Sequence, residues 1–224
     1  MSPHTDHDHD DHGDHDHDHD HDDPHAPRPD HDAGPKSAYE VLEAAMRELL
    51  IEKGVFTAAD LSASVDLMDS RTPALGATIV ARAWTDPAFK ARLLADTRAA
   101  LLERQIDIGT VAEFRTVENT DALHNVVVCT LCSCYPKMLL GIPPAWYKSS
   151  AYRSRTVVDP RGVLEEFGVV LPHSVAVRVH DSTADFRYLV LPRRPDGTEG
   201  WSEQRLAELV TRDAMIGTAI PTVA

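Results

Sequence analysis

Three cysteines lie within six residues of one another and are the residues best suited to chemistry. They are Cys129, Cys132 and Cys134, the only cysteines among 224 residues. Cysteines this close cannot form the long-range disulfides of a secreted scaffold, so they indicate a metal site in a reducing compartment. A loop this tight also brings the backbone amides of Ser133 and Cys134 beside the three sulfurs. It therefore offers five donors to one ion and leaves a sixth position open.

The donor types indicate what such an ion would do. Thiolates and deprotonated amides are strong donors that suit a trivalent, low-spin ion. An open position on this Lewis acid can activate water or polarise a bound substrate, which is hydration or hydrolysis chemistry. Two other interpretations stay open. One is a structural zinc site of three cysteines with His124, His173 or His180, and the other is a metal carrier that is not an enzyme.

The segment from Cys129 to Pro136 reads C-T-L-C-S-C-Y-P and is similar to the metal-binding signature of cobalt-type nitrile hydratase alpha subunits. Thr130 is typical of the cobalt version, whereas iron members usually have Ser there. The likeness covers roughly residues 38–220 and includes residues 80–84, 86–90, 118–120, 143–144, 146–148, 152–155, 200–202 and 210–213. The gamma subunit of thiocyanate hydrolase has the same loop and a His-Asp-rich start, so it stays open as an alternative.

The resemblance implies a subunit that hydrates a nitrile to its amide at a non-corrin Co3+ centre; iron is the less expected metal. Cys129, Cys132 and Cys134 would supply sulfur, and the nitrogens of Ser133 and Cys134 would complete the set. Cys132 would become a sulfinic acid and Cys134 a sulfenic acid, the latter a nucleophile or base beside the substrate. The resemblance also implies a beta-type partner subunit, as one chain or split in two, whose arginines balance these oxygens. An activator or metallochaperone would supply the cobalt.

Other positions match the family less closely. Arg187 matches a family arginine, and Asp185 stands where most members have Glu. An ordinary exposed cross-strand ion pair is the alternative interpretation of these two residues. Lys137-Met138 stands where the family has a Trp, and Thr110 where it often has Gln, so we expect an unusual substrate pocket. The acid at position 185 favours a neutral nitrile over the thiocyanate anion.

The rest of the chain must position this loop, and its first 37 residues are predicted to be a disordered tail. His and Asp alternate from His4 to Asp32 with almost nothing apolar to bury, so no burial would offset the entropy lost on ordering this segment. Such a tail is either a metal-loading arm or a solubilising segment, and both interpretations stay open.

Two ordered regions are predicted, which makes the fold class α+β: an N-terminal helical arm at 38–104, then a mixed α/β sheet domain at 105–224 that binds the metal. The arm includes a helix from Ala38 to Gly54, a capping box of Thr57 with Asp60, and a helix that Asp86-Pro87 begins and that reaches about residue 103. It could hardly enclose a core alone. Predicted elements of the second region are strands at 125–128, 175–179 and 186–191 and helices at 160–168 and 202–212.

Charge and hydropathy exclude several classes of protein. The net charge is −14, but residues 1–32 hold 12 Asp and one Arg, and the remainder holds 24 acids and 21 bases. Its Lys and Arg are scattered, so neither nucleic-acid nor membrane-surface binding is indicated. No apolar run reaches the ~18 residues of a membrane span, and the first residues have neither the basic start nor the apolar stretch of a signal peptide. We therefore expect a cytoplasmic protein.

Overall fold

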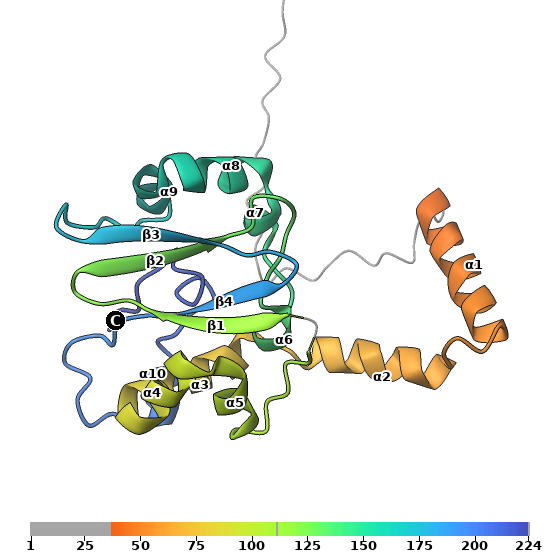
Figure 1. Cartoon of the computed structure of the whole chain (residues 1–224), viewed down its shortest axis with the longest axis horizontal. Coiled ribbons are helices and arrows are strands. Elements are labelled where there is room, and N and C mark those ends of the chain that lie inside the picture. The colour runs from red at the N-terminus through yellow and green to blue at the C-terminus, as the bar shows by residue number, and fades with distance from the viewer. Residues whose placement is uncertain (1–36, 111, 224) are drawn as a thin grey trace, which may run out of the picture. The chain divides into compact units, whose positions relative to one another are not determined.

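The computed structural model describes residues 37–110 and 112–223 and divides the chain into two compact units, residues 1–55 and 56–224. The predicted tail lies almost wholly outside the described residues. The elements in chain order (Figure 1) are α1 (Ala38–Glu52), α2 (Ala58–Asp69), α3 (Pro73–Thr85), α4 (Pro87–Ala95), α5 (Thr97–Leu102), β1 (Glu113–Glu118), β2 (Leu123–Val128), α6 (Lys137–Leu140), α7 (Ala145–Lys148), α8 (Ser150–Val158), α9 (Pro160–Glu166), β3 (Ala176–Asp181), β4 (Phe186–Leu191) and α10 (Glu203–Ala207). The α+β class is confirmed.

Helices α1 and α2 bury no side chain. Ser37 caps α1 reciprocally with Glu40, and Thr57 caps α2 reciprocally with Asp60, which confirms the predicted capping box. On α1 the side chains at 42, 46 and 49 are about half exposed, and their spacing places them on one face. These two helices therefore form without a core of their own.

Helices α3 to α5 contribute to the same hydrophobic core as the strands. Ile79, Leu93 and Leu101 are fully buried there. The predicted helix from Pro87 to about residue 103 is divided, because the chain is extended at Asp96 and the Asp96 carboxylate caps the N–H of Ala99. Part of the predicted arm therefore packs in one core with the strands. The predicted domain boundary after residue 104 stays a prediction.

Two parallel strand pairs form the centre of the second unit. β1 pairs with β4, and β2 pairs with β3, in the register Val128 opposite Asp181. Figure 1 shows the strands in the order β3, β2, β4, β1, with α8 and α9 beside β3 and with α3, α4 and α5 beside β1. The short connection 182–185 leads from the end of β3 into β4. The end of β2, where the cysteines follow, therefore lies near the start of β4.

The chain near its C-terminus joins the two strand pairs. The N–H of Val127 in β2 donates to the carbonyl of Ile216, and that of Val190 in β4 donates to the carbonyl of Met215. Gly217 has a φ of +92°, and a Cβ there would lie 2.0 Å from the Asn125 carbonyl oxygen, so this close approach requires glycine. Helix α10 ends at Ala207, short of the predicted end at about residue 212.

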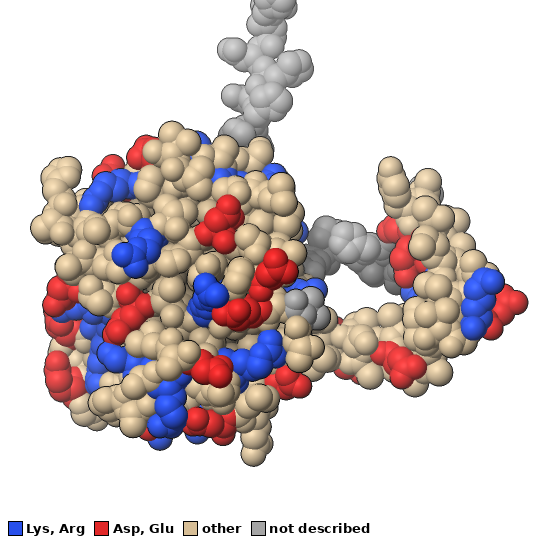
Figure 2. All heavy atoms as spheres, in the orientation of Figure 1, with Lys and Arg blue, Asp and Glu red and all other residues tan. Residues whose placement is uncertain are grey.

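The described surface of the second unit carries mixed charge. Figure 2 shows Lys and Arg interspersed with Asp and Glu on the visible face. Ten ion pairs join described residues, and most of them are well exposed, so each contributes little stability. Among the described helices, none is both long and apolar enough to cross a membrane.

Candidate metal centre

The three cysteines lie in the loop between β2 and α6, directly after a fully buried strand end. Their sulfur atoms all lie within 4.8 Å of one another. The sulfur of Cys132 is 3.5 Å from that of Cys129 and 3.3 Å from that of Cys134, and all three are free thiols. Cys129 is buried, Cys134 is half-buried and Cys132 is exposed. The loop thus gathers three soft donors at a point that is open to solvent on one side.

Two side chains from distant elements hold this loop, and the sequence did not predict either. Asp181, the last residue of β3, accepts from the N–H of Thr130 at 2.9 Å and from its hydroxyl at 2.6 Å. The fully buried Tyr147 donates its hydroxyl to the carbonyl of Cys134 at 2.8 Å. Both ends of the cysteine loop are therefore fixed. Asp181 is 51 residues from Thr130, and only the parallel pairing of β2 with β3 brings them together.

The thiols and the neighbouring amides perturb one another. Hydrogen bonds with the thiols of Cys134 and Cys129 lower the pKa of Cys132, and the backbone N–H groups of Ser133 and Cys134 act in the same direction. Burial raises the pKa of the Cys134 thiol to about 12, and the positive charge of Arg187 opposes that rise. These interactions place both predicted amide donors and Arg187 close to the sulfurs.

Arg187 and Asp185 do not form an ion pair. One guanidinium nitrogen of Arg187 donates to the carbonyls of Phe186, at 3.0 Å, and Ala184, at 3.3 Å, and it also donates to that of Thr183. No ion pair of the described chain includes Asp185, whose side chain is exposed. The guanidinium is thus held by backbone oxygens at the start of β4, and its charge is not balanced by the nearby acid.

The histidines of the described chain do not join the cysteines. His124 is buried between the carbonyl of Gly217, at 2.7 Å, and the amide of Asn119, and burial lowers its pKa. His180 lies 2.8 Å from the Asn125 side-chain oxygen. Neither these two nor His173 belongs to the group of sulfurs. A zinc site of three cysteines and one histidine therefore has no fourth ligand among the described residues.

A cavity of about 270 Å³ opens near the cysteine loop. It is lined by Met68, Ile108, Gly109, Ala112, Phe114, Tyr135, Lys137, Met138 and Arg187. Tyr135 directly follows Cys134, and Lys137-Met138 is the pair that departs from the family's pattern. Lys137 and Met138, two of the three positions predicted to make the pocket unusual, therefore line a cavity together with Arg187, whereas Thr110 is not among its lining residues.

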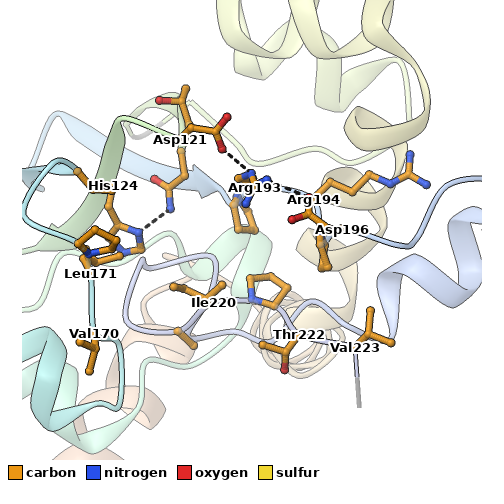
Figure 3. A pocket seen from close by; sticks show the side chains of 18 residues that line it. Asp121, His124, Val170, Leu171, Arg193, Arg194, Asp196, Ile220, Thr222 and Val223 are labelled. Carbon is orange, nitrogen blue, oxygen red and sulfur yellow. Dashed lines mark hydrogen bonds and ion pairs between the residues drawn. The ribbon is translucent and has the colours of Figure 1, made fainter.

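A larger cavity of about 590 Å³ lies at the other end of β2, where His124 contributes to its wall (Figure 3). Arg193 pairs there with Asp121 at 2.8 Å and with Asp196 at 2.9 Å. Because Arg194 also lines this cavity, its two arginines balance its two aspartates. Because the cysteines follow the opposite end of the strand, we assign the chemistry to the smaller cavity despite the larger volume of this one.

The hydroxyl of Thr130 gives a test of the clamp on the loop. Thr130→Val removes the hydroxyl's hydrogen bond to Asp181, leaves the backbone N–H bond and keeps the side-chain shape. We expect the metal-binding conformation of the loop to lose about 1 kcal/mol of stability. At limiting cobalt, occupancy of the matured protein should fall roughly fivefold. Elemental analysis measures this, and Thr78→Val is the matched control, since the Thr78 hydroxyl bonds only within its own helix. Unchanged occupancy would show that the clamp does not shape the site.

Comparison with known proteins places this site in a family. Residues 37–219 match the family described as nitrile hydratase, alpha chain. The chain belongs to the nitrile hydratase alpha-chain family. This confirms the resemblance that the cysteine signature indicated.

Three relatives of this nitrile hydratase alpha chain show the range of the family. The low-molecular-weight cobalt-containing nitrile hydratase subunit alpha of Rhodococcus rhodochrous is 50% identical over 179 residues, or 80% of this chain and 86% of that protein. The thiocyanate hydrolase subunit gamma of Thiobacillus thioparus is 46% identical over 196 residues, or 83% and 81%. A solved thiocyanate hydrolase with partially modified cobalt centres superposes with a TM-score of 0.79 at 43% identity, covering 85% of this chain and 95% of that one.

Proposed function

We propose that this chain is the metal-carrying subunit of a nitrile hydratase, which adds water to a nitrile and yields the amide at a low-spin Co3+ ion. The cysteine loop carries the proposal, because three sulfurs lie within 4.8 Å with two backbone amides beside them. This donor set suits a trivalent ion. Support comes from the family match and from the cobalt-containing relative at 50% identity.

Each residue of the site has a proposed role. The sulfurs of Cys129, Cys132 and Cys134 and the nitrogens of Ser133 and Cys134 would hold the ion. The bound ion would supply a Lewis acid that activates the reacting groups. An external oxidant such as dioxygen would oxidise Cys132 to a sulfinic and Cys134 to a sulfenic acid, which places negative oxygens beside the substrate. The Cys134 oxygen would take one proton from the attacking water as the water oxygen bonds to the nitrile carbon, and that proton would pass to the nitrile nitrogen. The hydroxyl proton of the resulting imidic acid would then move to the same nitrogen and give the amide.

The charged residues of the site are proposed to act on the Cys134 oxygen and the substrate. Arg187 already places a positive charge near the Cys134 thiol, so it would stabilise the negative oxygen there. Asp185 lies in the short connection before β4 and would orient water at the entrance. A beta-type subunit, in one or two chains, would complete the site, and an activator or metallochaperone would load the cobalt.

Thiocyanate hydrolysis is the second candidate. It is favoured by the gamma-subunit relative at 46% identity and by the positive charges of Lys137 and Arg187 at the cavity, since thiocyanate is an anion. Against it, the cavity of about 270 Å³ has apolar walls that a small anion would leave unfilled.

The size of the cavity provides a test that separates nitrile hydration from thiocyanate hydrolysis. We expect the enzyme assembled with its partner chains to convert an aromatic nitrile with a higher kcat/KM than thiocyanate. Met138→Trp refills the cavity and should lower that preference about tenfold, since a pocket discriminates by the volume it offers. Steady-state assays of amide and of carbonyl sulfide measure both reactions, with thiocyanate as the internal control. Faster release of carbonyl sulfide by the unmodified enzyme would make thiocyanate hydrolysis the function.

A further inference from the structure

The charges that line the cavity beside the cysteine loop are all of one sign. Lys137 and Arg187 are the charged members of the nine lining residues, and no Asp or Glu is among those described. Ile108, Phe114 and Met138 supply apolar wall. The cavity therefore combines room for a ring with two cations and no acid to neutralise them.

Neither cation is neutralised by a carboxylate elsewhere. No ion pair of the described chain includes Lys137 or Arg187. Arg187 is held by backbone carbonyls, which fix its position and leave its charge. Two acids that adjoin lining residues in sequence have other partners: Asp107 accepts from the N–H of Gly109 at 2.8 Å, and Glu113 pairs with Arg115 at 2.8 Å. Two positive charges that no described carboxylate pairs with therefore border a partly apolar cavity. Arg187 is half-buried and Lys137 is exposed, so water screens the charge of Lys137 more than that of Arg187.

We propose that this cavity takes a nitrile that carries an anionic group, with the aromatic or aliphatic body against Phe114 and Met138 and the anion facing Lys137. This inference rests on the proposed function and adds its substrate class. Arg187, which lies near Cys134, serves the end of the substrate that reacts, and Lys137 serves the end that is charged. Lys137 is thus a specificity-determining residue at a position where the sequence departs from the family.

A matched pair of substrates tests the proposal on the assembled, cobalt-loaded enzyme. The pair is 3-cyanobenzoate and 3-nitrobenzonitrile, because a nitro group has nearly the shape of a carboxylate and no net charge. We expect the ratio of kcat/KM for the first to that for the second to favour the anion. Lys137→Gln should lower this ratio about tenfold. Lys137→Arg should keep most of it, because either cationic side chain can bind an anion.

The control is Lys148→Gln, which removes an exposed lysine that does not line the cavity. That variant should leave the ratio unchanged. If Lys137→Gln lowers kcat/KM for both nitriles equally, or lowers the cobalt content, Lys137 is a counterion of the negatively charged loop and the proposal is wrong. An unchanged ratio also overturns it. If neither nitrile yields an amide while thiocyanate is consumed, the proposed function itself has failed.

Discussion

Protein matured with its partner chains is expected to contain one cobalt ion per chain and to weigh three oxygen atoms more than its sequence predicts. Two oxygens should lie on Cys132 and one on Cys134, because strong sulfur and amide donation favours a trivalent ion whose exposed thiolates oxidise. Cys132 is the most exposed of the three and has a lowered pKa, which favours its thiolate. Intact mass and elemental analysis together measure the two quantities.

Replacing one of the sulfurs should have the largest effect of any change in this chain. Cys132→Ser exchanges the sulfur that contacts both others for a hard oxygen, so cobalt content should fall to a small fraction. Turnover should fall roughly a thousandfold, in line with the loss of the group that activates the reactants. Ser133→Ala is the matched control for cobalt content, since the proposed donor at 133 is its backbone nitrogen and that nitrogen stays.

Two results would contradict these predictions. Active protein with stoichiometric zinc and three unmodified thiols would contradict both the metal and the mechanism. Cobalt that exchanges readily from unmodified thiols, without any turnover, would instead indicate a metal carrier, because an inert trivalent centre releases its metal too slowly for that role.

Local signals in the sequence predicted much of this fold. The reciprocal cap at Thr57 and the bounds of β4 at Phe186–Leu191 were predicted, because they depend on a few neighbouring residues. The similar cap at Ser37 was not predicted. β1 was missed although Phe114 and Thr116 alternate with exposed residues, a period-two pattern that could have revealed it. The four-residue helices α6 and α7 each begin directly after a proline and have too few residues for a periodic signal.

In the site too, the sequence predicted the grouping of residues that are close along the chain and did not predict contacts between distant residues. The spacing of Cys129, Cys132 and Cys134 predicted a cluster of sulfurs, and the structure shows one. The roles of Asp181 and Tyr147 could not be predicted, because they depend on strand pairing and on helix packing across many residues. The ion pair of Asp185 with Arg187, which was the alternative interpretation of these two residues, is absent, because the Arg187 guanidinium donates to backbone carbonyls at the start of β4.

The chain without its partners presents an apolar helix face and an unbalanced charge. On α1, Leu42, Met46 and Leu49 are 54%, 54% and 48% exposed, and such a face is stabilised when another protein covers it. Near the sulfurs, Arg187 is the described cation that acts on Cys134, and part of its guanidinium already donates to backbone oxygens. Two oxidised sulfurs would need further donors, which a partner subunit is proposed to supply.

The isolated, cobalt-loaded chain is therefore expected to be nearly inactive, with turnover at least roughly a hundredfold below that of the complex, because one lost stabilising donor alone costs that much. Adding the beta-type chain or chains should restore it. Met46→Asp should weaken assembly by placing a charge on the apolar face of α1, whereas Arg47→Ala, off that face, should not. Size-exclusion chromatography and amide production measure both effects. Full turnover by the single chain would mean that its own residues, and not those of a partner, balance the charge of the oxidised cysteines.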